Sequence, residues 1–151
     1  MPYDVKKLDV WTGEIDDKVG GLASKLELLA KAGVDLQFLV ARRQPHLPGR
    51  GVVFLSGISG AKGTKAAAAA GLAKASDVVA LRVEGPNKAG AAYEITRRLA
   101  DAGINLRGVS AGVMGKKFQL FLAFDSAADA DKAARSLPLA ARFRKGYRRP
   151  A

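Results

Sequence analysis

Four polar side chains stand at matched positions in the two halves of the sequence: Asp17 and Asp35 in the first half, Asn87 and Asn105 in the second. An amide side chain both donates and accepts hydrogen bonds, so two asparagines can hold an ammonium group and a carboxylate at once. Aspartates accept from an ammonium group but repel a carboxylate. We therefore expect the second half to hold the better site for such a ligand. The first half is expected to be weaker, differently selective or purely structural.

A glycine-containing turn follows the first residue of each pair. The turn residues are Lys18, Val19, Gly20 and Gly21 after Asp17, and Lys88, Ala89, Gly90 and Ala91 after Asn87. A turn that leads into a helix offers free backbone N–H groups and the positive end of the helix dipole, which together suit a carboxylate. Asn and Asp are also ordinary helix caps, which leaves Asn87 and Asp17 a purely local alternative role. Asn105 is more informative, because a strand disfavours asparagine unless something uses the amide.

Groups that catalyse reactions or bind metals are scarce. The sequence has no cysteine and a single histidine, His46, so it cannot assemble a thiol nucleophile or a metal site rich in Cys and His. Residues 57–65, GISGAKGTK, look like a phosphate-binding loop but lack Gly-Lys-Ser/Thr at the required spacing. We predict no catalytic residues, no metal and no cofactor.

Charge is the unusual feature of the composition. The chain has 25 Lys and Arg against 14 Asp and Glu, for a net charge of +11. The positive residues are dense only in a basic C-terminal tail that contains Arg142, Arg144, Lys145, Arg148 and Arg149. This balance permits nucleic-acid binding without establishing it, and a well-solvated basic surface is the simpler interpretation.

The hydropathy pattern favours a soluble protein. Hydrophobic residues make up 48% of the 151 positions, and no apolar run approaches the roughly 18 residues of a membrane span. The N-terminus does not read as a secretory signal. We expect a cytoplasmic protein with no membrane segment.

The sequence repeats itself at an offset of 70 residues. DKVGGL at 17–22 aligns with NKAGAA at 87–92, and AGVDL at 32–36 aligns with AGINL at 102–106. Gly33 and Gly103 stand where a helix would end in a left-handed residue. We assign one repeat to residues 1–76 and the other to residues 77–151.

Each repeat shows the same order of expected elements. In the first we expect strands at 5–15, 36–43 and 52–56 and helices at 21–32 and 62–75; in the second, strands at 78–84, 106–113 and 118–124 and helices at 91–102 and 126–137. Residues 140–147 can supply a fourth strand to the second repeat. Residues 75–85 have room for one strand, so we predict that the first repeat lacks its own fourth strand or shares the strand at 77–84. The pattern predicts an α+β fold of two ferredoxin-like βαββαβ repeats, each an antiparallel sheet with its helices on one face.

The strand, the Asp/Asn-Lys-x-Gly turn, the helix and the Ala-Gly-Val/Ile-Asp/Asn-Leu segment together resemble the ACT domain. The likeness covers both repeats, although Val19 and Ala89 replace the proline that is common in the family. The resemblance implies a regulatory module that binds amino acids between two such units. It also implies that Asn87 and Asn105 match the asparagines that hold the ligand's polar groups.

We therefore predict a non-enzymatic tandem ACT protein that senses an amino acid, forms a homodimer and regulates an enzyme or a transcription factor. Two alternatives remain. One is a nucleic-acid-binding module, with Phe121 as the stacking candidate on the strand at 118–124. The other is a protein-interaction module that regulates its partner without a ligand.

Overall fold

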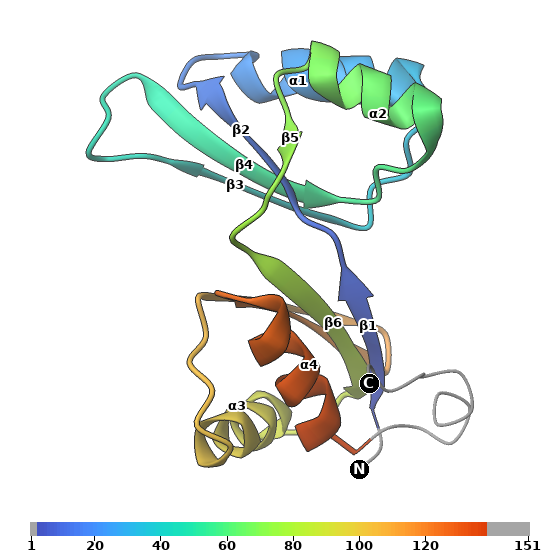
Figure 1. The fold of residues 1–151 in the computed structure, drawn as a ribbon, viewed down its shortest axis with the longest axis vertical. Helices are drawn as coiled ribbons and strands as arrows, with labels where there is room; N and C mark the ends of the chain where they lie inside the picture. The colour runs from blue at the N-terminus through green and yellow to red at the C-terminus, as the bar shows by residue number, and fades with distance from the viewer. Residues whose placement is uncertain (1–2, 139–151) are drawn as a thin grey trace. The chain divides into compact units, whose positions relative to one another are not determined.

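The computed structural model describes residues 3–138, which form two compact units (Figure 1). The inserted unit comprises Asp9–Ser76. The split unit comprises the described residues on either side of it, 3–8 and 77–138. Within residues 3–138, no helix has the length and apolar character needed to cross a membrane.

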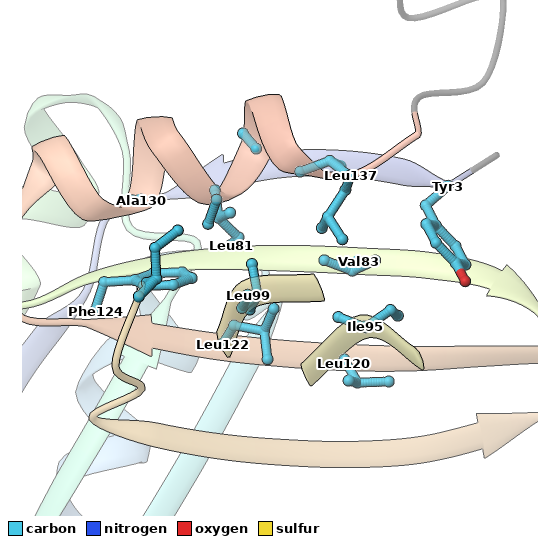
Figure 2. Close-up of a cluster of buried hydrophobic side chains, with 14 of the residues drawn as sticks. Tyr3, Leu81, Val83, Ile95, Leu99, Leu120, Leu122, Phe124, Ala130 and Leu137 are labelled. Carbon is cyan, nitrogen blue, oxygen red and sulfur yellow. The ribbon is translucent and has the colours of Figure 1, made fainter. Parts of the chain in front are cut away.

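The split unit is an antiparallel sheet with two helices on one face. Its elements are β1 (Asp4–Leu8), β6 (Val79–Pro86), α3 (Ala91–Asp101), β7 (Gly108–Met114), β8 (Lys117–Phe124) and α4 (Ala127–Ser136), with the strands in the order β1-β6-β8-β7. Val83 and Leu120 lie opposite each other in register and are 0% and 2% exposed. Figure 2 shows these side chains gathered with Ile95 and Leu99 of α3. Burying each such side chain contributes about 1.5–3 kcal/mol, so this layer between sheet and helices is the core that holds the unit together.

The inserted unit repeats this arrangement. Its elements are β2 (Trp11–Asp16), α1 (Gly21–Lys31), β3 (Phe38–Arg43), β4 (Arg50–Ser56), α2 (Gly60–Ala69) and β5 (Ala73–Lys74), with the strands in the order β3-β4-β2-β5. Leu29, Val53 and Leu55 form the centre of its core, and none is more than 1% exposed. The predicted α+β, ferredoxin-like fold of two repeats is confirmed. The left-handed glycines predicted after α1 and α3 are also confirmed, since Gly33 and Gly103 have φ values of 73° and 74°.

The N-terminal strand differs from the prediction. The predicted strand over residues 5–15 is two strands, interrupted at Asp9 and Val10. β1 pairs with β6 of the split unit, with Val5 opposite Val83, and so takes the fourth position in that sheet. The predicted repeat boundaries, 1–76 and 77–151, therefore differ from the observed units in residues 3–8. The predicted strand at 140–147 lies outside the described residues.

The prediction that the first repeat lacks its own fourth strand is wrong. β5 pairs with β2, where Lys74 lies opposite Trp11. The helix predicted over residues 62–75 ends earlier, because Gly71 has a φ of 74° and stops the alanine-rich helix. The chain after this glycine is extended and completes the sheet.

Candidate functional site

The two helices that follow the polar turns both begin after a left-handed glycine. Gly20 has a φ of 80° and Gly90 a φ of 85°, a region that glycine enters without steric cost. The Gly21 amide donates to the carbonyl of Lys18 at 3.0 Å, and the equivalent bond from the Ala91 amide measures 3.1 Å. The sequence repeat at these turns is therefore a structural repeat.

Asp17 and Asn87 do not cap these helices. Gly20 and Gly90 occupy the cap positions, and neither helix has a side-chain capping hydrogen bond. The alternative of a local capping role is therefore wrong. The other residues of the two turn segments before the glycines are exposed: Lys18, Val19, Lys88 and Ala89.

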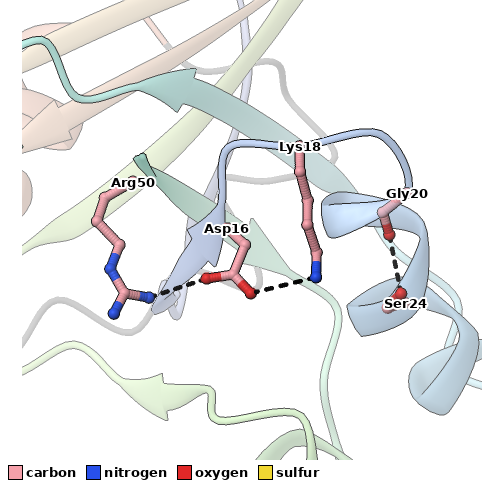
Figure 3. A network of polar contacts seen from close by, with 5 residues as sticks. All are labelled: Asp16, Lys18, Gly20, Ser24 and Arg50. Carbon is pink, nitrogen blue, oxygen red and sulfur yellow. Dashed lines mark hydrogen bonds and ion pairs between the residues drawn. The ribbon is translucent and has the colours of Figure 1, made fainter. Parts of the chain in front are cut away.

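The side chain of Asp17 instead forms an ion pair with Arg43 at the end of β3. The Arg43 Nε lies 2.6 Å from Oδ2 of Asp17, and Nη2 lies 3.5 Å from Oδ1. The neighbouring carboxylate, Asp16, is 2.9 Å from Nη1 of Arg50 and 3.8 Å from Nζ of Lys18 (Figure 3). Each acidic side chain of this turn is therefore matched by a basic one.

These side chains border a crevice between the turn after β2 and the end of the edge strand β3. The crevice has a volume of about 220 Å³. Its lining is apolar at Ile15, Leu22, Ala41 and Gly51 and charged at Asp16, Asp17, Lys18, Arg42 and Arg43. It thus presents both signs of charge beside an apolar surface.

Position 21 of this turn requires glycine, because there is no space for a side chain. A Cβ on Gly21 would collide with the carbonyl oxygen of Asp16. The split unit has Ala91 at the equivalent position, so its turn leaves room for a side chain. The turn of the inserted unit is therefore folded more tightly than the turn of the split unit at this position.

Asp35 lies outside this crevice. It lines a second hollow, of about 370 Å³, together with Gly33 at the end of α1 and Ser59 and Lys62 at the start of α2. The length of α1, about 16 Å for its eleven residues, separates Asp35 from the turn at Asp17. The two predicted aspartates therefore do not share a site.

Asn87 and Asn105 lie at opposite ends of the sheet in the split unit. The Asn87 amide donates to the carbonyl of Lys116, just before β8, at 2.8 Å, whereas Arg107, two residues after Asn105, donates to Ala123 at the far end of β8. At about 3.4 Å per residue, these two points of contact are roughly 24 Å apart. The expected amide pair is therefore not assembled within one split unit, and a site that uses both side chains needs a second molecule of the protein.

The stacking candidate, Phe121, lies on the helix-free face of the split unit. It stands opposite Arg82 and Ser110 in register. Beside it, Glu84 accepts a 2.5 Å hydrogen bond from Gln119 and lies 3.2 Å from Nε of Arg82. Asp4 also lies 3.9 Å from Arg82, so two carboxylates share one guanidinium, and the remaining negative charge disfavours a phosphate backbone.

Metal-binding clusters are absent from the part of the chain that the structure describes. No group of three or more His, Cys, Asp or Glu side chains within residues 3–138 is arranged to hold an ion. His46 is exposed in the loop between β3 and β4.

Comparison with known families decides the nature of the split unit. Residues 79–137, which run from β6 through α4, match the family model of the ACT domain. This segment matches the ACT domain family. The family resemblance seen in the sequence is thereby confirmed for the second repeat.

Solved structures share the fold of the ACT domain and of the inserted unit together. The regulatory subunit of aspartate kinase from Thermus thermophilus, in a ligand-free form, is 13% identical, with 90% of this chain and 94% of that chain covered and a TM-score of 0.63. Protein BT0572 from Bacteroides thetaiotaomicron is 17% identical, with 88% of each chain covered and a TM-score of 0.67. The aspartate kinase of Clostridium acetobutylicum is 14% identical with a TM-score of 0.60, and the match covers 89% of this chain but 32% of that enzyme. At these identities the likeness establishes the fold. A search of curated protein sequences found no match.

Sequence reasoning missed Arg43 and Arg50, the two residues that complete the charged turn. The sequence does carry a signal for this pairing. Arg43 and Arg50 flank the loop between two expected strands, and two acidic residues, Asp16 and Asp17, stand at the end of the strand before α1. Recognising it requires knowing that β4 pairs with both β2 and β3, which sets Arg50 opposite Asp16. The ACT domain lacks the counterpart of Arg43, because Val113 stands at the matching position of β7.

Proposed function

We propose that this chain is a non-catalytic regulatory protein that binds an amino acid in the crevice of the inserted unit. The observation that carries the proposal is the Asp17–Arg43 ion pair, which sets a carboxylate and a guanidinium side by side at the rim of the crevice. The ACT domain at 79–137 and the fold shared with a regulatory subunit of aspartate kinase support the regulatory role. The regulated partner would be an enzyme or a transcription factor.

Arg43 and Asp17 can give up their mutual contact and bind the carboxylate and the ammonium group of a zwitterion instead. Arg43 offers a planar pair of donors to a carboxylate, and Asp17 accepts from an ammonium group. The side chain of Arg43 is 76% exposed, and exposed ion pairs contribute only about 0.2–1 kcal/mol, so opening this one costs little. The crevice of about 220 Å³ is smaller than the roughly 300–1,000 Å³ of sites for drug-sized ligands, which favours a metabolite of few heavy atoms.

The proposed amino-acid site lies in the first repeat, whereas the sequence predicts the better site in the second. Asp17 and Asp35 of the first repeat suggested repulsion of a carboxylate, but Asp35 lies outside the crevice. Arg43 and Arg50 compensate for Asp17 and Asp16, so the turn no longer repels an anion.

Thermal unfolding in the presence of each of the twenty amino acids tests the proposal. A ligand at about 100 times its dissociation constant stabilises the protein by about 2.7 kcal/mol, which raises the melting temperature by several degrees. We expect one amino acid or a small chemical group of them to do so. The variants Arg43→Gln and Asp17→Asn should abolish the response. Arg107→Gln is the matched control, because Arg107 pairs with Asp77 at 3.2 Å in the split unit and does not line the crevice.

Two results would reject amino-acid binding at this crevice. The first is no shift with any amino acid, and the second is a shift that survives both crevice variants. Retention on immobilised RNA that falls steeply with salt, without any amino-acid response, would instead support nucleic-acid binding, which the net charge of +11 favours.

We also propose that the protein is a homodimer that pairs through β7. This strand is an edge of its sheet and has no charged residue between Gly108 and Met114. Val109, Val113 and Met114 on it are 49%, 59% and 67% exposed. Natural edge strands usually carry charges or proline that prevent pairing, and their absence favours association with a second copy.

A further inference from the structure

The inserted unit interrupts the sheet of the split unit. β1 and β6 are neighbours in that sheet, yet all of residues 9–76 lie between them in the sequence. β1 is part of the core, since Tyr3 and Val5 at this edge are 2% and 7% exposed. The sheet of the split unit therefore depends on a strand that precedes the whole inserted unit.

The chain segments that enter and leave the inserted unit are held together. Trp11 lies opposite Lys74 in register, and the Ala75 amide donates to the carbonyl of Val10 at 2.8 Å. Asp9 and Lys74 form an ion pair at 3.3 Å. Only Asp9 and Val10 separate β1 from β2. While the inserted unit is folded, the chain segments that connect it to β1 and to β6 therefore start from adjacent points.

Loop closure gives this arrangement a thermodynamic consequence. The probability that two chain ends meet falls with about the 3/2 power of the loop length. With the inserted unit folded, the effective loop between β1 and β6 is about five residues; with it unfolded, the loop grows to about 70 residues. The closure of β1 onto β6 then becomes roughly 50-fold less favourable.

We propose that the folded inserted unit acts as a clip that keeps β1 in the sheet of the ACT domain. The element with two states is β1, which is either paired with β6 or detached. Any event that stabilises the inserted unit, including a ligand in its crevice, strengthens the retention of β1. The coupling runs through chain connectivity and does not require the proposed ligand.

Hydrogen exchange of the full-length protein, read by mass spectrometry, tests the clip. Leu55→Ala removes a fully buried side chain from the core of the inserted unit. We expect the peptide that covers β1 to exchange about tenfold faster or more, together with the inserted unit, while the β7–β8 hairpin keeps its protection. Val53→Ala is the milder substitution if Leu55→Ala fails to fold, and Leu28→Ala, at a side chain that is 39% exposed, is the control that should leave β1 unchanged.

Two outcomes would overturn the clip. In one, the inserted unit exchanges faster but β1 keeps its protection, so β1 does not depend on the inserted unit. In the other, β1 and the β7–β8 hairpin accelerate equally, so the two units unfold as one and no detachable strand exists. The absence of amino-acid binding would leave the clip untouched, which separates this test from that of the proposed function.

Discussion

The protonation of Tyr3 is linked to folding. Burial raises the pKa of its phenol, the negative charge of Glu94 raises it further, and Arg98 opposes both. The ring packs edge-on against Phe118, with centroids 5.9 Å apart. Because the folded pKa lies above that of the unfolded chain, the stability linked to this proton is complete below pH 10 and is lost as the pH rises through the folded pKa.

The Tyr3→Phe variant should remove this part of the pH dependence. The variant keeps the aromatic contact with Phe118 but has no proton to lose. We expect the free energy of unfolding of the unaltered protein to fall more than that of the variant between about pH 8 and about pH 11.5. Urea unfolding at a series of pH values measures the difference. Parallel curves for the two proteins would show that Tyr3 does not contribute.

The contacts between individual site residues were harder to predict from the sequence than the helices and strands. The turn residues at 17–21 and 87–91 were found because glycine and polar side chains recur at one offset. The partner of Asp17 was not found, because Arg43 is 26 positions away and meets it only once β2 and β3 have joined the same sheet. The position of Asn105 beside a strand predicts a use for its amide, and the residue is exposed. Local preference identifies candidates, but only strand pairing decides which of them meet.

Among the elements, α2 and α4 offer a matched comparison of helix caps. Both begin after a serine with extended backbone, at φ values of −151° for Ser59 and −152° for Ser126. Ser126 Oγ accepts a 3.1 Å hydrogen bond from the Asp129 amide, whereas the side chain of Ser59 makes no capping bond. Ser126→Ala should therefore cost about 1 kcal/mol of stability and Ser59→Ala close to none. Chemical denaturation of both variants checks this, and equal losses would contradict the role of the cap.

Helices and strands were predicted well where local sequence features, such as a glycine or a regular alternation, mark their extent. Gly33 and Gly103 stop two helices, and the alternation from Phe118 to Phe124 marks a half-buried strand. The prediction failed at residues 9 and 10, where neither glycine nor proline interrupts an extended segment. There the chain passes from one sheet to another, and only tertiary pairing reveals the break.

The β7 edge allows a sharp test of dimerisation. A twofold contact uses the same strand of both copies, so Val113→Arg would bring a positive charge into the interface twice. Because Val113 is 59% exposed, the substitution should change the stability of the monomer by less than about 0.5 kcal/mol. We expect sedimentation velocity to show a dimer for the unaltered protein and a monomer for the variant. Leu39→Arg on β3, at a side chain that is 40% exposed, is the control that should remain dimeric. A monomeric unaltered protein would reject the β7 dimer.

For the whole molecule, topology rather than composition sets the boundaries of the folding units. Sequence repetition places a boundary at residue 77, where the second copy of the pattern begins. The structure agrees on the inserted unit from Asp9 to Ser76 but joins residues 3–8 to the ACT domain. Repetition cannot reveal this exchange, because β1 has no sequence counterpart at the offset of 70 residues that relates β2 to β6 and β3 to β7.

A fragment of residues 77–151 therefore tests the whole-molecule arrangement. Without β1 it lacks Tyr3 and Val5 from its core and leaves the edge of β6 unpaired. Each lost apolar side chain removes about 1.5–3 kcal/mol, a large share of the 5–15 kcal/mol that stabilises a typical domain. We expect the fragment to show no cooperative melting by circular dichroism, and a synthetic peptide of residues 1–8 added in excess to restore it. A cooperative transition of the fragment alone would mean that the fragment folds without β1. The clip formed by the inserted unit would then be dispensable for closing the sheet.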